Sequence, residues 1–204
     1  MLTTPSKIIS IALVLLSSFF SGLARGEDLA AAVAAGKVSV TFHGTGGSTG
    51  DAIEVVVTKT RKGGESLELT VPAGTRLTSG NAGSQSMVIA SVKGQVFGGN
   101  RYIPSATIEA TSTPKTYVMD AYCAEFEKDN PSSATRFSLG RVDPVLACIL
   151  SKASDLSQQA RQAAVWIYTD KVNFAQMNRK FSVSQSDWNA AKSTVQKCLA
   201  KKGG

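Results

Sequence analysis

The hydrophobic period of this chain changes near residue 130, and this change constrains the fold more than any other feature. Before Asn130 apolar residues alternate with polar ones, as in Val38, Val40 and Phe42, which is the period of a half-buried strand. After the turn-forming segment 130–133 the period becomes about 3.6, and Ala, Leu, Gln and Lys replace β-branched residues. We therefore expect a strand-rich region over 25–130 and a helical region over 131–204 packed on it, in an α+β fold.

The region 25–130 contains short β-branched runs separated by glycine-rich turns. The runs include Ile53–Val57, Leu67–Val71 and Met87–Val92. Segments such as Gly44–Gly50 divide them at the spacing of a sandwich or a barrel built from antiparallel strands. This pattern predicts about seven strands in a sandwich-like arrangement.

Three to four helices are expected after residue 131, because each has a recognisable start. Asp143 can cap a helix that has Pro144 at its first position and runs to Lys152. Ser157 can cap the next helix, whose segment 165–168 is apolar almost all round. A short helix over 173–180 and a last one opened by Ser184 or Ser186 complete the region.

The first 24 residues have the pattern of a secretory signal peptide. Lys7 is the positive residue, Ile8–Phe20 is the apolar run, and small residues precede a cleavage site near Ala24. The alternative is an uncleaved anchor, but the run is shorter than the roughly 20 apolar residues of a stable span. The sequence thus predicts a protein exported to the periplasm or the exterior, without a membrane-spanning segment in its mature chain.

Composition favours a globular chain, since 43% of the residues are hydrophobic and 18% are charged. Lysine and arginine outnumber the acidic residues by 22 to 15, but the positive charge is scattered, so we expect no nucleic-acid partner. Lys59, Arg61 and Lys62 form a small basic patch at a strand end. This patch is either a solvated turn or a contact for an acidic surface polymer.

No metal or cofactor is expected from the residue pattern. His43 is the only histidine, and no Cys-x-x-Cys pair accompanies it. The acidic residues Glu125, Glu127 and Asp129 lack the order of a calcium loop and include Lys128 among them. A solvated acidic edge is the better interpretation.

The chain has three cysteines, so at least one stays outside any intramolecular pair. Cys148 and Cys198 lie on the apolar faces of two expected helices, and we favour a disulfide between them. The alternative joins Cys123 to one of these two cysteines, because spacing does not fix connectivity. In the favoured pairing Cys123 is a free thiol near the end of a strand, on the same face as Met119 and Ala121.

Two short motifs indicate a chemical role for the free thiol. The segments are Tyr122-Cys123-Ala124-Glu125 and Gln162-Ala163-Ala164-Val165-Trp166. Together they resemble the paired signature of thioester domains in bacterial surface adhesins. The resemblance implies that Cys123 is the thiol and Gln162 the acyl donor of an internal thioester, which an amine or hydroxyl of a target would open.

These observations favour an exported, non-enzymatic binding or surface-interaction module, whose ligand (a surface, a protein or a glycan) and oligomeric state are not identified. The first alternative is a covalent adhesion module with a Cys123–Gln162 thioester. The second is a secreted cysteine hydrolase in which His43 is the base for Cys123, although no flanking sequence supports it.

Overall fold

The computed structural model describes residues 26–99 and 101–201, so the expected signal peptide lies outside the described residues. Ten strands and five helices are assigned in this part of the chain. The strands are β1 (Glu27–Asp28), β2 (Val38–Gly44), β3 (Thr49–Lys59), β4 (Leu67–Thr70), β5 (Thr75–Ser79), β6 (Met87–Gly98), β7 (Arg101–Pro104), β8 (Ile108–Ala110), β9 (Lys115–Cys123) and β10 (Arg136–Val142). The helices are α1 (Leu29–Ala34), α2 (Pro144–Lys152), α3 (Gln158–Thr169), α4 (Phe174–Lys180) and α5 (Gln185–Ala200).

The strands form a closed barrel, and the expected sandwich is therefore wrong. Six antiparallel strands follow each other in the order β5-β10-β2-β3-β9-β6, and β6 pairs again with β5 to close the ring. The pairing of β6 with β9 contains two register shifts, which bend a long strand. Alternation in the sequence shows which residues face inward, but it does not show which strands pair, so a sandwich and a barrel share the same pattern.

One barrel strand lies in the region where we expected only helices. β10 pairs with β2 and with β5, so it completes the ring. Of its seven residues only Phe137 is buried, and its other positions include two arginines, a serine and a glycine. Such a strand has too little apolar alternation to stand out in the sequence.

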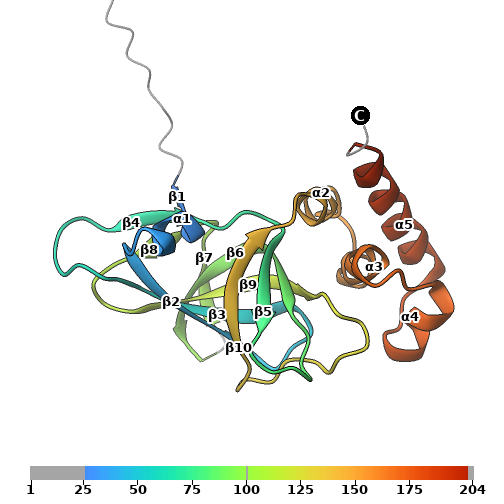
Figure 1. Ribbon diagram of the computed structural model, residues 1–204, viewed down its shortest axis with the longest axis horizontal. Coiled ribbons are helices and arrows are strands. Elements are labelled where there is room, and N and C mark those ends of the chain that lie inside the picture. Colours follow the sequence, from blue (N-terminus) through green and yellow to red (C-terminus); the bar gives the residue numbers. More distant parts are fainter. Residues whose placement is uncertain (1–25, 100, 202–204) are drawn as a thin grey trace, which may run out of the picture.

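A second, three-stranded sheet in the order β1-β4-β8 lies beside the barrel together with α1 (Figure 1). Asp28 caps α1 by accepting a hydrogen bond from the Ala31 amide at 2.9 Å. Leu69 and Ile108 of this sheet are fully buried in the core. The small sheet thus extends the same hydrophobic core and forms no separate one.

Helices α2 to α5 are grouped on one side of the barrel (Figure 1). Their starts lie where the sequence places them, with Asp143, Ser157, Asn173 and Ser184 as the N-caps. α3 packs against both β9 and α5. No helix among the described residues is long and apolar enough to cross a membrane.

Candidate functional site

The free cysteine is the last residue of β9 and has no exposed surface. Its Sγ lies 3.6 Å from Sδ of Met87, the residue that faces it across the β6–β9 pair. The other two cysteines, Cys148 of α2 and Cys198 of α5, form a disulfide with their Cα atoms 5.8 Å apart. Cys123 is therefore the one thiol of the described chain.

Gln162 lies on the face of α3 that covers the end of β9, and it is also fully buried. Its Oε1 accepts a hydrogen bond from the Cys123 amide at 2.9 Å, and its Nε2 donates to the Cys123 carbonyl at 2.8 Å. The side-chain amide therefore makes both hydrogen bonds that a neighbouring strand would make. The fold thus brings together the two residues that the thioester resemblance singles out, although 39 positions separate them.

The chain that follows Cys123 leaves the sheet, and side chains accept hydrogen bonds from two of its backbone amides. The amide of Glu125 donates to Oε1 of Gln85 at 3.2 Å, and the amide of Phe126 donates to Oδ1 of Asp170 at 3.1 Å. The same Gln85 oxygen accepts a hydrogen bond from the Trp166 indole at 3.3 Å. Gln85 and Asp170 were not singled out from the sequence, because polar residues that bond to a distant backbone have no periodic signature.

Aromatic rings cover this segment. Trp166 makes edge-to-face contacts with Phe126 and Phe181, with ring centroids 5.1 and 5.6 Å apart. The Lys180 ammonium lies 5.4 Å from the centre of the Phe126 ring and donates to the carbonyls of Phe126 and Lys128. Water is therefore excluded around Cys123, and burial raises the pKa of its thiol to about 12. At neutral pH a free Cys123 is a protonated thiol.

An ion pair lies on the other face of β9, beside the Cys123–Gln162 contact. Nη1 of Arg161 lies 3.0 Å from Oδ2 of Asp120, which also accepts a hydrogen bond from the Tyr122 hydroxyl at 3.4 Å. Burial raises the pKa of the Asp120 carboxyl, and the charge of Arg161 partly offsets this. This ion pair links α3 to β9 through Arg161, the residue that precedes Gln162.

We expect Arg161→Met to lower the free energy of unfolding by about 3 kcal/mol at pH 7, because it leaves a buried carboxylate unpaired. The pKa of Asp120 is higher in the folded protein than in the unfolded chain, so its protonated form adds to the free energy of unfolding. This stabilisation is complete below the unfolded pKa and is lost as pH rises through the folded pKa. Without Arg161 the folded pKa rises further, so the loss should be smaller at pH 3 than at pH 7. Urea unfolding at both pH values measures it, with Arg161→Met/Asp120→Asn as control. An equal loss at both pH values would contradict this assignment.

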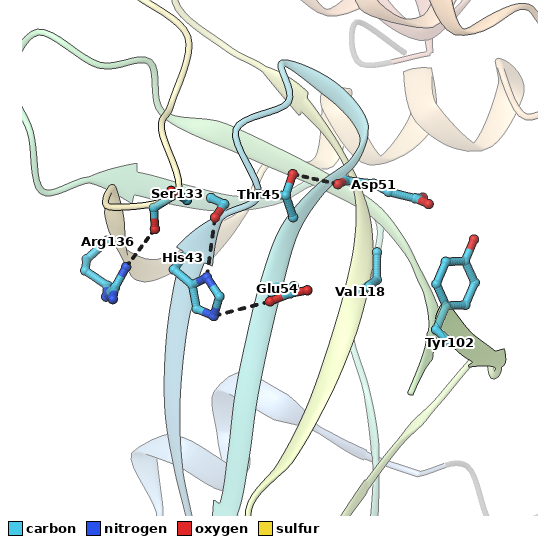
Figure 2. Close-up of a pocket in the computed structure, with 9 residues that line it drawn as sticks. His43, Thr45, Asp51, Glu54, Tyr102, Val118, Ser133 and Arg136 are labelled. Atoms are coloured by element: carbon cyan, nitrogen blue, oxygen red, sulfur yellow. Dashed lines mark hydrogen bonds and ion pairs between the residues drawn. The ribbon is translucent and has the colours of Figure 1, made fainter. Parts of the chain in front are cut away.

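A groove of about 530 Å³ lies on the outer face of the barrel (Figure 2), and Cys123 is not among its lining residues. Gly94 allows β7 to come close, since a Cβ at this position would lie 2.2 Å from the Ile103 carbonyl oxygen. Tyr102 of β7 therefore lines the groove opposite His43. The ionisable and hydroxyl residues that line it are His43, Thr45, Asp51, Glu54, Tyr102, Ser133 and Arg136.

His43 and Cys123 contact different residues. Its Nε2 lies 3.6 Å from Oε2 of Glu54, and its Nδ1 lies 3.4 Å from the Gly44 carbonyl oxygen (Figure 2). Cys123 instead contacts Met87 and Gln162. The structure therefore does not bring together the base and the nucleophile that the hydrolase alternative requires.

The residues described by the structure contain no cluster of three or more His, Cys, Asp or Glu side chains able to hold a metal ion. The candidate site is thus a buried thiol and carboxamide, and the groove beside His43 is a separate polar surface. Comparison of the chain with protein-family models, curated proteins and solved structures found no match.

Proposed function

We propose that this chain is an exported interaction module that attaches covalently to its target through a thioester between Cys123 and Gln162. The observation that carries the proposal is the contact between these two fully buried residues, which bond to each other through both backbone groups of Cys123. The disulfide between Cys148 and Cys198 supports it further, because it leaves Cys123 as the available thiol. A disulfide is also typical of an exported protein.

The proposed reaction needs no additional reagent. Sγ of Cys123 attacks Cδ of Gln162, the S–Cδ bond forms and the Cδ–Nε2 bond breaks. The thiol proton passes to Nε2, which leaves as ammonia. The Cys123 amide already donates to Oε1, the atom on which negative charge develops, and therefore stabilises the tetrahedral intermediate.

In the capture of a target the sulfur is the leaving group, whereas it is the nucleophile when the thioester forms. A target amine attacks Cδ, the new N–Cδ bond forms and the S–Cδ bond breaks, while one amine proton returns to the sulfur. A hydroxyl would give an ester in the same way. The buried position protects the thioester from water, so the target must first displace the segment that Lys180 and Trp166 hold in place.

The intact mass of the mature, non-reduced protein tests the proposal. We expect the mass of one ammonia to be missing, in addition to the two hydrogens lost to the disulfide. Methylamine should then add once and expose one thiol. Gln162→Ala and Cys123→Ala should abolish both changes. The matched control is Gln158→Ala, which removes an exposed glutamine one turn earlier on α3 that bonds to Thr49.

A mass that shows only the disulfide, with one titratable thiol at Cys123, would refute the thioester. The Gln162 carboxamide would then serve only to hold α3 on the end of β9. The second candidate function, non-covalent recognition by the groove beside His43, would remain. It is favoured by a specific observation, since the groove combines both signs of charge with the Tyr102 ring in one accessible surface.

A further inference from the structure

A second groove, of about 610 Å³, lies between the end of α1 and the loop that joins β3 to β4. We call it the basic groove, because four cationic side chains and no carboxylate are among its lining residues. The four are Lys37, Lys59, Arg61 and Lys62. The sequence patch at 59–62 is thus one wall of a groove, and Lys37 extends it from the other side.

Two of these cations are held in place. Nζ of Lys37 lies 2.8 Å from Oε1 of Glu27, outside the groove lining. Nζ of Lys59 donates to the carbonyls of Gly63 and Glu65 and so fixes the shape of the loop. Arg61 and Lys62 are exposed, and neither makes an ion pair with any residue that the structure describes. The groove therefore presents two unneutralised charges on a loop whose carbonyls are bonded by Lys59.

Glycines leave the backbone of this groove open. Gly36 and Gly63 have φ values of 66° and 77°, and an added Cβ would have no atom within 4 Å at either position. A ligand chain can consequently approach the main chain closely. No aromatic side chain is among the lining residues, so the groove has no surface on which a nucleic-acid base would stack.

We propose that the basic groove binds a linear polymer bearing sulfate or phosphate groups and no bases. Arg61 would bind such groups bidentately, and Lys62 would add a point charge. This site does not depend on the proposed thioester. Thr49 pairs with Tyr122 at one end of β3, whereas Lys59 lies at the other end, so the two sites lie at opposite ends of an 11-residue strand.

Binding of heparin and of long-chain polyphosphate, measured by calorimetry at several salt concentrations, tests the proposal and distinguishes the two sources of anionic group. We expect Arg61→Ala/Lys62→Ala to weaken binding of at least one polymer about tenfold or more. The slope of log affinity against log salt should become shallower by about 1 to 2, because two charge contacts are lost. The matched control is Lys192→Ala/Lys197→Ala, which removes the same charge from exposed positions of α5.

Three results would overturn the proposal. The first is that neither polymer binds to the unmodified chain. The second is an equal loss in the control variant, which would assign the binding to net charge alone. The third is tighter binding of a single-stranded oligonucleotide than of both polymers. Gln162→Ala should bind the polymers as the unmodified chain does, which keeps this test separate from that of the thioester.

Discussion

Replacing Trp166 with alanine should lower the free energy of unfolding by about 4 kcal/mol, within the usual range for a fully buried tryptophan. Trp166 is 2% exposed and stands between Phe126 and Phe181, so its loss removes two edge-to-face contacts and leaves a cavity. The substitution also removes the indole hydrogen bond to Gln85. The segment after Cys123 should therefore loosen together with the helix.

Urea unfolding followed by circular dichroism measures this loss, because the variant has only one tryptophan left for fluorescence. Trp166→Phe is the matched variant. It keeps an aromatic ring and should cost clearly less, while it still lacks the bond to Gln85. A loss below about 1 kcal/mol for Trp166→Ala would show that the ring does not hold α3 on the barrel.

Local sequence signals predicted the helices well, for a physical reason. Helix α2 begins after Asp143, whose Oδ1 accepts hydrogen bonds from the amides of Val145 and Leu146, and the Asp-Pro pair encodes this start within two residues. Barrel closure depends instead on which distant strands pair. The β5–β6 pairing joins segments whose own patterns are compatible with several partners, so the sequence did not distinguish a barrel from a sandwich.

The candidate site shows the same division. Cys123 and Gln162 were predicted through a resemblance in two short motifs, and the fold places them in contact. The side chains around them were not predicted, because Gln85 and Asp120 form hydrogen bonds and an ion pair with residues that only the tertiary fold brings near. A buried polar side chain looks like a surface residue in the sequence until its partner is known.

The disulfide gives the second large expected effect. The double variant Cys148→Ser/Cys198→Ser should lower the free energy of unfolding by about 4 kcal/mol on the chain-entropy account, because the bond closes a loop with a sequence separation of 50. The bond restricts the unfolded chain more than it changes the folded one, since α2 and α5, the two helices that it joins, also pack together directly. The native fold should therefore persist at low temperature. For a domain of this size the melting temperature should fall by about 10 °C.

Thermal and urea unfolding of the double variant and of the unmodified chain, with and without reductant, measure this effect. Reductant should destabilise only the unmodified chain, to about the level of the variant. Cys123→Ala is the control for thiol loss, because it leaves the disulfide intact. α3, which carries Gln162, lies between α5 and β9. Loss of the disulfide can therefore affect the position of Gln162 only through the packing of α5 on α3. If the double variant lost less than about 1 kcal/mol, the bond would be a minor reinforcement and the packing of α5 on α3 would hold the helices together.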